Sequence, residues 1–358
     1  MNSKIVLILM STPEKSPYLD YYTFYLNKMG INYDMIIWDR DNSYSNEKIP
    51  NVFVYKKYSN LQKSHFAKFI DMIGFGHYVK SILKKNQYKK LILFTIQSSF
   101  FLSQSLLNYK RKYIIDVRDY SPLLKLGLFN KLFNKLTSKS FSTVLSSPNF
   151  IKFVTSENIY ISHNIHPQSL FNTKCGQFNF KFPIKILTIG QIRDYESNQA
   201  LIHSLGNNKN YNLIFSGKGN AVNALENYVK QTQIENIEFT GSYNKSEEDK
   251  IVESCDIINS FMPDNFNSLN LLSNRLYLCV RIGKPIIVNS NSIQGEIVKK
   301  YNLGIAIDNT INLTDILNTY LSNFNSEKFN QGRIQFMSVI KEDYLKFEKM
   351  LSLFAKEI

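Results

Sequence analysis

Residues 268–289 of this chain read SLNLLSNRLYLCVRIGKPIIVN. Apolar residues recur at helical spacing through this stretch as far as Ile282, a pattern that predicts a helix with one buried face. Gly283 is the residue type that commonly ends a helix, and Pro285 then opens a short apolar run that is typical of a buried strand. The stretch therefore predicts a helix, a tight turn and a buried strand.

The same stretch resembles the donor-side signature of nucleotide-sugar glycosyltransferases of the two-domain GT-B fold, especially family 4-like enzymes. Those enzymes carry the pattern N-K-L-x-E-x-x-A-x-G-K-P-V-I. The matching residues of this chain are Asn274, Arg275, Leu276, Gly283, Lys284, Pro285, Ile286 and Ile287. The two glutamates of the family's E-x7-E pair fall on Asn270 and Leu278, so neither carboxylate is present.

A helix start of this kind can hold a diphosphate, because its first N–H groups lack partners within the helix and carry a partial positive charge. Ser273 and Asn274 head the predicted helix and, together with Arg275, would add side-chain donors. We therefore expect Ser273 and Asn274 to bind the donor. The order of helix, glycine and strand occurs in any α/β protein, so the assignment depends on the rest of the chain.

The length of 358 residues exceeds the size at which a single core usually keeps growing, so we expect two domains. A hydrophobic content of 44% and a charged content of 20% are typical of a soluble globular protein. No apolar run approaches the roughly 18 residues of a membrane span, and the opening run is too short for a signal peptide. The three cysteines, Cys175, Cys255 and Cys279, are far apart, and we expect free cytosolic thiols.

The net charge of +14 is concentrated in the first half of the chain. Residues 1–166 hold 23 Lys and Arg against 10 Asp and Glu, whereas residues 167–358 hold 20 against 19. A basic half attracts polyanions, either nucleic acid or an anionic membrane, where each cation near the surface contributes about 1 kcal/mol. A chain rich in Asn, Lys, Ile and Tyr would gain lysine by composition alone, but that does not explain the asymmetry.

Strands and helices alternate along the whole chain, which predicts doubly wound parallel sheets. In the first domain, residues 1–166, strands are predicted at 4–10, 33–38, 51–55, 91–96, 113–117, 144–147 and 158–161. After a linker at 167–183, strands of the second domain, residues 184–332, are predicted at 184–189, 213–216, 237–240, 256–260, 286–288 and 303–307. Residues 333–358 are predicted to form a long helix, which in GT-B proteins crosses back onto the first domain.

Two glycine-containing turns in the second domain are similar to donor-binding turns of the same family. Gly190 and Arg193 follow its first strand, where family members carry a glycine and basic residues that contact the donor pyrophosphate. A glycine permits close approach, and a guanidinium matches phosphate oxygens. The turn Gly217, Lys218 and Gly219 follows the second strand, like the family's G-x-G turn under the nucleotide. The resemblance thus implies that these five residues bind the donor.

Acidic residues follow two predicted strands of the first domain. Arg118 and Asp119 end the run IDVRD, which is similar to a segment beside the acceptor cleft of family 4-like enzymes. By this resemblance, Asp119 would orient or deprotonate an acceptor hydroxyl, and Arg118 would neutralise a phosphate on the acceptor side. A strand-end Asp is also a common helix cap.

Asp39 and Asp41 form a D-x-D triplet of the kind that can hold Mn²⁺ in single-domain GT-A enzymes. Acids at the end of a strand are more often solvated, and we expect no metal.

His163 and the segment 123–141 have two alternative interpretations each. His163 lies in a turn resembling the family's segment before the interdomain linker, so it is a candidate catalytic base or phosphate contact; a structural hydrogen bond is the alternative. Segment 123–141 combines an apolar stripe with Lys131, Lys135 and Lys139. It would dock on an anionic bilayer, or its stripe would pack on the sheet and leave the lysines solvated.

The resemblance implies an α/β protein with two Rossmann-like doubly wound domains facing a cleft. Its activity would be transfer of a sugar from a UDP- or GDP-linked donor to a hydroxyl of a lipid-linked glycan in bacterial capsule, exopolysaccharide or O-antigen synthesis. We expect no cofactor, no metal and no nucleic-acid partner, and a cytoplasmic location, peripheral on the inner face of the cell membrane through the basic half. Alternatives are a GT-B nucleotide-sugar epimerase, or a non-catalytic GT-B module that binds polyanions.

Overall fold

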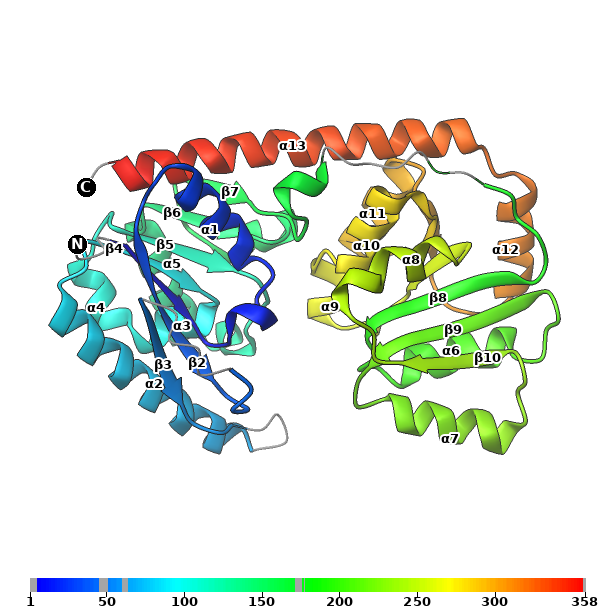
Figure 1. Cartoon of the computed structure of the whole chain (residues 1–358), viewed down its shortest axis with the longest axis horizontal. Coiled ribbons are helices and arrows are strands. Elements are labelled where there is room, and N and C mark those ends of the chain that lie inside the picture. The colour runs from blue at the N-terminus through cyan, green and yellow to red at the C-terminus, as the bar shows by residue number, and fades with distance from the viewer. Residues whose placement is uncertain (1–4, 45–50, 60–63, 171–175, 177, 357–358) are drawn as a thin grey trace. The chain divides into compact units, whose positions relative to one another are not determined.

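The computed structural model describes residues 5–44, 51–59, 64–170, 176 and 178–356. The chain forms two compact units, which are drawn in Figure 1. Unit 1 comprises residues 1–166 and 342–358, and unit 2 comprises residues 167–341. Each unit is built on one parallel sheet, of seven strands in unit 1 and six in unit 2. The prediction of two doubly wound α/β domains is therefore confirmed.

The sheet of unit 1 has the strand order β3-β2-β1-β4-β5-β6-β7. Its strands are β1 (Ile5–Leu9), β2 (Tyr33–Asp39), β3 (Val52–Lys56), β4 (Lys90–Phe94), β5 (Tyr113–Val117), β6 (Ser142–Leu145) and β7 (Ile159–Ile161). The helices are α1 (Leu19–Lys28), α2 (His65–Asn86), α3 (Ile96–Phe101), α4 (Ser103–Asn108) and α5 (Gly127–Lys139), with short 3-10 turns η1 (Pro13–Lys15), η2 (Pro122–Lys125) and η3 (Pro148–Phe153). Every residue of β1, β4, β5 and β6 is buried, as expected for parallel strands covered on both faces.

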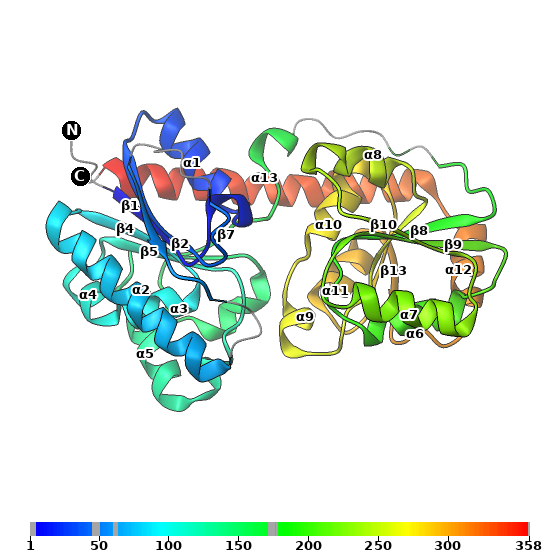
Figure 2. The same ribbon diagram turned by 60° about the horizontal axis from the view of Figure 1, so that its bottom comes forward.

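The sheet of unit 2 has the order β10-β9-β8-β11-β12-β13. Its strands are β8 (Ile184–Gln191), β9 (Tyr211–Lys218), β10 (Ile237–Gly241), β11 (Ile257–Ser260), β12 (Ile286–Asn289) and β13 (Gly304–Ile307). The helices are α6 (Glu196–Leu205), α7 (Val222–Thr232), α8 (Glu248–Glu253), α9 (Phe266–Asn270), α10 (Asn274–Leu278), α11 (Ile293–Lys300) and α12 (Leu313–Ser322), with turns η4 (Pro167–Leu170) and η5 (Lys245–Glu247). Figure 2 shows helices on both faces of this sheet.

In both sheets the order of the strands reverses at one point. This point lies between β1 and β4 in unit 1, and between β8 and β11 in unit 2. The connections on its two sides leave the sheet in opposite directions, which opens a crevice beyond the carboxyl ends of the strands where ligands of such sheets bind. The reversal between β8 and β11 therefore marks where to look for a ligand site in unit 2.

The stretch 268–289 forms the predicted helix, turn and strand, with one local difference. Helix α10 changes after Leu278 into a π-helical turn, η6 (Cys279–Gly283), before β12 begins at Ile286. Gly283 has φ +86°, and a Cβ there would lie 2.6 Å from the Arg333 side chain. Glycine is therefore required both by the backbone conformation and by the neighbouring side chain.

The last helix, α13 (Ser326–Lys356), begins before Arg333, where the sequence placed its start, and contributes residues to both units. Its final part packs on α1 within unit 1. The ring of Tyr344 stacks on Tyr21 at 4.5 Å, and the ring of Phe347 lies 5.0 Å from that of Tyr22. No helix in the described part of the chain is both long and apolar enough to cross a bilayer.

Candidate functional site

Arg275 occupies the point in unit 2 where the strand order reverses. Its Nε donates to the carbonyl of Ile189 in β8 at 2.7 Å, and its Nη1 donates to the carbonyl of Asn259 in β11 at 3.2 Å. A third, longer bond runs from Nη2 to the carbonyl of Gln191 at 3.4 Å. One side chain from α10 thus joins the carboxyl ends of the two strands that diverge at the reversal.

The charge of Arg275 has no carboxylate partner among the described residues. Its hydrogen bonds all end on backbone carbonyls. Burial of the guanidinium lowers the pKa of Arg275 to about 10, so the group is still charged at neutral pH. A buried charge is costly unless it is paired. An anion bound beside Arg275 would supply the missing counter-charge.

The nearby acids of α8 are already paired. Asp249 accepts from Arg281 at 2.6 Å, and Glu248 accepts from Lys245 at 2.5 Å. Glu248 also accepts from the hydroxyl of Tyr243 at 3.2 Å, and burial raises the pKa of that hydroxyl, so Tyr243 stays neutral. The described partners of Arg275, in contrast, include no acid.

The glycines predicted at the ends of β8 and β9 come together in the structure. The register pairs Gly190 with Gly217, and both have positive φ, +94° and +141°. A Cβ on Gly217 would lie 1.9 Å from the carbonyl oxygen of Gly190, and one on Gly219 would lie 2.0 Å from that of Ile192. The two turns therefore approach as closely as backbones can, and only glycine fits.

Two exposed cations lie on these turns. Arg193 donates from Nε to the side-chain oxygen of Gln191 at 2.5 Å, and its side chain is exposed. Lys218 is also exposed, and the register places it opposite Gln191. The carboxyl ends of β8 and β9 thus carry Arg193 and Lys218 on the same edge of the sheet that Arg275 reaches from α10.

Ser273 and Asn274 differ in their surroundings. The hydroxyl of Ser273 is buried, donates to Gln294 Oε1 at 2.7 Å and lies 3.0 Å from the hydroxyl of Ser260. Asn274 is exposed. The helix start is therefore tied to α11 through Gln294, a residue that no motif in the sequence identifies.

The two positions of the missing glutamate pair hold side chains without negative charge. Asn270 is buried and donates to the carbonyl of Phe266 at 2.6 Å, which is a bond within α9. Leu278 is buried in the core. These two positions of the family's pattern therefore supply no carboxylate.

In unit 1 the structure places Arg118 inside the protein. It forms an ion pair with Asp116, and donates to the hydroxyl of Ser162 at 3.0 Å and to Asn164 Oδ1 at 3.1 Å. The hydroxyl of Tyr22 donates to the same carboxylate of Asp116 at 2.6 Å. Arg118 therefore ties the end of β5 to the segment after β7. Asp119, the next residue, is exposed.

His163 is also buried, and its Nε2 lies 2.9 Å from Asp343 Oδ2 in α13. This contact holds the final part of α13 on unit 1. Of the D-x-D acids, Asp41 pairs with Lys15, and Asp39 is buried and accepts from the backbone of Ser43 at 3.1 Å. In the part of the chain that the structure describes, no three His, Cys, Asp or Glu side chains gather as a metal site would require.

No protein-family model and no curated protein matches this sequence. Solved structures do match over nearly the whole chain. Sucrose-phosphate synthase from Thermosynechococcus elongatus has a TM-score of 0.73 at 11% identity, covering 98% of this chain and 99% of that one. HepE from Anabaena, solved with UDP, has a TM-score of 0.66 at 12% identity, covering 99% and 100%.

A third similar structure is UDP-N-acetylglucosamine 2-epimerase from Rickettsia bellii, with a TM-score of 0.66 at 10% identity, covering 99% of this chain and 97% of that one. The epimerase thus shares this architecture with sucrose-phosphate synthase although the two enzymes are named for different reactions. At such identities the likeness establishes the architecture and not the reaction. The chain has the GT-B fold of nucleotide-sugar glycosyltransferases.

Proposed function

We propose that this protein transfers a sugar from a nucleoside-diphosphate donor to a hydroxyl group of an acceptor. The observation that carries the proposal is Arg275, a half-buried cation without a carboxylate partner at the strand reversal of unit 2. A diphosphate placed there would receive charge-assisted hydrogen bonds from Arg275, with Arg193 and Lys218 on the adjacent turns. HepE, which shares the fold, was solved with UDP, so UDP is the first nucleotide to test, followed by GDP.

The chemistry that such a site can supply is electrostatic. As the bond between sugar and diphosphate breaks, negative charge develops on the leaving phosphate, and fixed cations stabilise it. In this proposal Arg275, Arg193 and Lys218 carry out that task without a metal. The exposed Asp119, at the end of β5, remains the candidate base for the acceptor hydroxyl. The buried contact of His163 with Asp343 favours a positioning role for His163.

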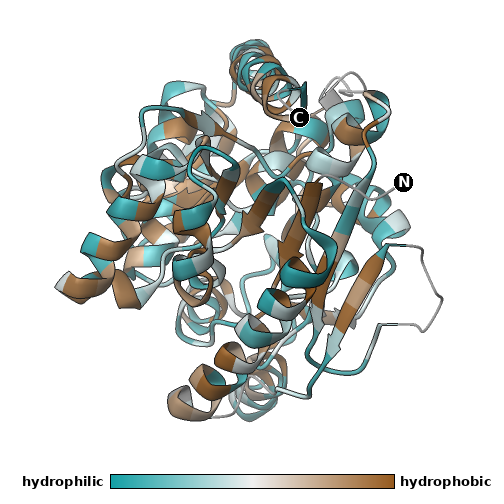
Figure 3. Ribbon diagram, turned by 90° about the vertical axis from the view of Figure 1, so that its left-hand side faces the viewer, coloured by the Kyte–Doolittle hydropathy of each residue, from teal (hydrophilic) through white to brown (hydrophobic). Residues whose placement is uncertain are grey.

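The acceptor we propose is a lipid-linked glycan, met at an anionic membrane surface during capsule, exopolysaccharide or O-antigen synthesis. Helix α2 supports this part of the proposal because apolar side chains lie on its outer as well as its inner face. Phe66 is 73% exposed and Ile70 is 47% exposed, while Phe75 and Val79, on the inner face, are buried in the core of unit 1. A helix that is apolar all round normally has a partner on both sides. Figure 3 shows brown, apolar stretches on the helices outside the strands.

The outer face of α2 continues into a groove of about 280 Å³ between α2, α3 and the start of α5. Phe69 and Ile73 line it from α2, and Phe129 and Leu132 line it from α5. The deeper residues of the predicted α5 stripe, such as Phe133, are fully buried, so that stripe packs inward instead of facing out. We call the exposed side chains Phe66, Phe69, Ile70, Ile73, Leu126 and Leu128 the α2 surface.

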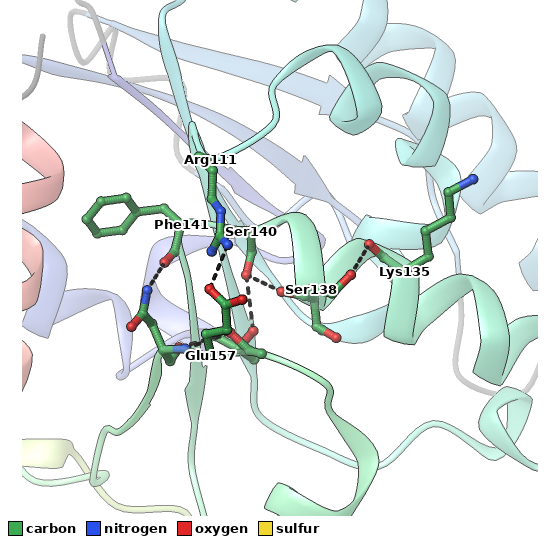
Figure 4. Close-up of polar contacts among 10 residues, drawn as sticks. Arg111, Lys135, Ser138, Ser140, Phe141 and Glu157 are labelled. Atoms are coloured by element: carbon green, nitrogen blue, oxygen red, sulfur yellow. Dashed lines mark hydrogen bonds and ion pairs between the residues drawn. The ribbon is translucent and has the colours of Figure 1, made fainter.

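The charges around the α2 surface are almost all positive. Residues 64–86 and 122–139 contain eight lysines and one acid, Asp71, which is buried and pairs with Lys57 at 2.9 Å. Figure 4 shows Lys135 extending from α5 away from the Arg111–Glu157 ion pair. An apolar patch rimmed by lysines matches an anionic bilayer, which combines an apolar interior with negative headgroups. This match supports a peripheral location on the inner face of the cell membrane.

A second candidate function is nucleotide-sugar epimerisation, which the similarity to the Rickettsia bellii epimerase favours. It would use the same donor site. The two reactions differ in their need for an acceptor, because an epimerase converts the nucleotide sugar alone. Incubating the protein with UDP-sugars and no acceptor therefore separates them: formation of an epimer would replace the transferase proposal.

The proposed donor site is tested by thermal melting with UDP, GDP, CDP and TDP, each with Mg²⁺ or with EDTA. A ligand that binds the folded state raises the melting temperature by mass action. We expect a rise with UDP or GDP that EDTA does not remove and that is lost in Arg275→Gln. No rise with any nucleotide would contradict the proposal and favour a non-catalytic, polyanion-binding protein. A rise that requires Mg²⁺ would contradict its metal-independent part.

A further inference from the structure

A polar cavity lies within unit 1. It has a volume of about 330 Å³ and lies beyond the carboxyl ends of β1 and β2. Met10, Thr12, Trp38, Arg40, Tyr58 and Ser59 are among the residues that line it. Met10 is also 3.9 Å from the hydroxyl of Thr95, which follows β4, so the cavity borders the strand reversal of unit 1. This is the place where a doubly wound sheet offers a ligand site.

Two hydroxyls in the wall of this cavity have no hydrogen-bond partner in the part of the chain that the structure describes. The side chains of Thr12 and Ser59 are 2% and 4% exposed, and neither hydroxyl oxygen has a hydrogen bond among the described residues. Buried polar atoms are nearly always bonded, so an unbonded pair in one wall calls for an explanation. A ligand with hydroxyl or other oxygen groups would satisfy both.

Arg40 adds to the same wall a cation that forms no ion pair with the described residues. Its guanidinium stacks on Trp38 at 4.5 Å, and its Nε is buried without a hydrogen bond in the described part of the chain. Asp71, whose charge acts on Arg40, pairs with Lys57 at 2.9 Å, and Asp41, the acid in the wall, pairs with Lys15. The wall therefore has more positive than negative charge, and an anionic group would compensate it.

The shape and composition of the cavity suit a small, hydroxylated ring. Tyr58 provides aromatic surface and is 54% exposed, whereas Trp38 is buried beneath the guanidinium of Arg40. Ligand sites commonly combine such surface with a few convergent polar groups, and a volume of a few hundred Å³ holds one or two sugar rings. Carbohydrate is the ligand class because the proposed function supplies it, so this step rests on that proposal.

We propose that this cavity binds a sugar unit bearing an anionic oxygen group, a carboxylate or a phosphate. Arg40 would bind the anionic group, and the hydroxyls of Thr12 and Ser59 would bind ring oxygens or hydroxyls. The acceptor glycan would then contain an acidic or phosphorylated residue. Neither the family resemblance nor the donor site implies this selectivity.

The test measures binding of glucuronate, glucose 1-phosphate, glucose and inorganic phosphate to the full chain by calorimetry, with UDP present to occupy the donor site. We expect glucuronate or glucose 1-phosphate to bind at least tenfold more tightly than glucose and than phosphate. Preference for one of the two identifies the anionic group as carboxylate or phosphate. Equal binding of inorganic phosphate and glucose 1-phosphate would overturn the sugar part of the proposal, and no preference over glucose would overturn all of it.

Variants assign the effect to the cavity. Arg40→Gln should weaken binding of the anionic sugar at least tenfold, whereas Lys209→Gln, which removes an exposed cation from unit 2, should leave it unchanged. Thr12→Val keeps the side-chain shape and removes an unpartnered hydroxyl, so it should lower sugar affinity while the melting temperature stays the same or rises. Unchanged sugar affinity in both Arg40→Gln and Thr12→Val would refute the assignment.

The two proposals fail in different ways. UDP titrated alone tests the donor site, and Arg40→Gln should bind UDP as the wild type does. Loss of all UDP binding would refute the proposed function but would leave the dependence of sugar binding on Arg40 measurable. Normal UDP binding with no binding of either anionic sugar would refute this inference alone.

Discussion

Arg275 Nε and the carbonyl oxygen of Ile189 lie 2.7 Å apart, which fixes a side chain of α10 to the end of β8. The next arginine of the same stretch, Arg281, instead donates to both carboxylate oxygens of Asp249, with Nη2 at 2.6 Å from Oδ1. Two arginines six positions apart thus have opposite surroundings: one is neutralised by an acid, and the other is held by carbonyls. Of these two arginines, Arg275 is the one whose described partners include no acid.

Replacing Arg275 should weaken nucleotide binding strongly. Arg275→Gln removes the charge, and we expect the affinity for UDP to fall by roughly 1.5–3 kcal/mol, which is more than tenfold. Titration calorimetry at neutral pH measures this directly. Arg281→Gln is the matched control: it should lower the melting temperature, because Asp249 loses its partner, and leave UDP affinity unchanged. Equal loss of affinity in both variants would show that the effect is structural.

Arg193 offers a separate test, because it lies on the exposed turn after β8. Its bond to Gln191, at 2.5 Å, holds the guanidinium near the edge of the sheet. Arg193→Ala should weaken UDP binding by roughly 1.5–3 kcal/mol without changing the melting temperature, since the side chain is exposed. Unaltered affinity would remove Arg193 from the donor site.

Gly217 should tolerate no side chain. Gly217→Ala would place a Cβ 1.9 Å from the carbonyl oxygen of Gly190 at φ +141°, so we expect unit 2 to lose roughly 3 kcal/mol of stability or more. Hydrogen exchange of peptides from β8 and β9 reports this loss locally. Gly127→Ala is the control, since nothing lies within 4 Å of its added Cβ, and it should stabilise α5 by about 0.4–1 kcal/mol. Wild-type exchange in Gly217→Ala would disprove the close approach of the turns.

The strands could be predicted because parallel strands covered on both faces are continuous apolar runs. Each strand of both sheets overlaps a predicted stretch; β5 (Tyr113–Val117) has the predicted bounds, whereas β6 begins two residues before its predicted stretch. Helix ends were harder to predict. The last helix begins at Ser326 instead of at Arg333, and the segment 123–141 is divided into η2 and α5.

The candidate site was only partly predictable. A glycine at the end of a predicted strand can be recognised in the sequence. The glycine after the first strand of the second domain therefore predicts Gly190 as a site residue, and the G-x-G turn after the second strand predicts Gly217. Contacts between distant segments have no such signal. The carbonyls that hold Arg275 are up to 86 positions away, and Asp343, which holds His163, is 180 positions away. Only the folded chain shows that no described acid pairs with Arg275.

Two of the three thiols should be unreactive in the native protein. Burial raises the pKa of Cys255 and of Cys279 to about 12, so at pH 8 each is a thiolate in only about one molecule in 10⁴. In a Cys175→Ser background, Ellman's reagent should find no thiol in native protein and two after denaturation. Cys175 lies outside the described residues, so the substitution removes it from the count.

The same two groups make stability depend on pH in the alkaline range. An unfolded thiol ionises near its ordinary pKa of about 9, whereas the folded one keeps its proton up to about 12. Between these values the folded state binds more protons than the unfolded state, so stability should fall as pH rises, and below pH 9 the thiols should contribute no pH dependence. A Cys255→Ala, Cys279→Ala variant with the same fall between pH 9 and 11 would contradict this account.

The α2 surface should decide whether the protein binds membranes. Phe66→Ser with Ile70→Ser removes two exposed apolar side chains, and Lys131→Glu with Lys135→Glu reverses two exposed charges. An anionic bilayer attracts each near-surface cation by about 1 kcal/mol, and burying an apolar side chain contributes roughly 1.5–3 kcal/mol. Each pair of substitutions should therefore reduce sedimentation with phosphatidylglycerol-containing vesicles at least tenfold. Vesicles of phosphatidylcholine alone should bind weakly, and salt should reduce binding to the anionic ones.

The control for that test is another pair of exposed apolar side chains, Ile334 and Leu345 of α13, which are 70% and 66% exposed. Ile334→Ser with Leu345→Ser removes as much exposed apolar surface and no lysine, and it should leave vesicle binding unchanged. All four residues replaced by serine are exposed, so folding should be little affected. If the α2 pair and the α13 pair reduce vesicle binding equally, binding depends on general surface hydrophobicity. If neither α2 nor lysine variants reduce it, the apolar face of α2 has another partner.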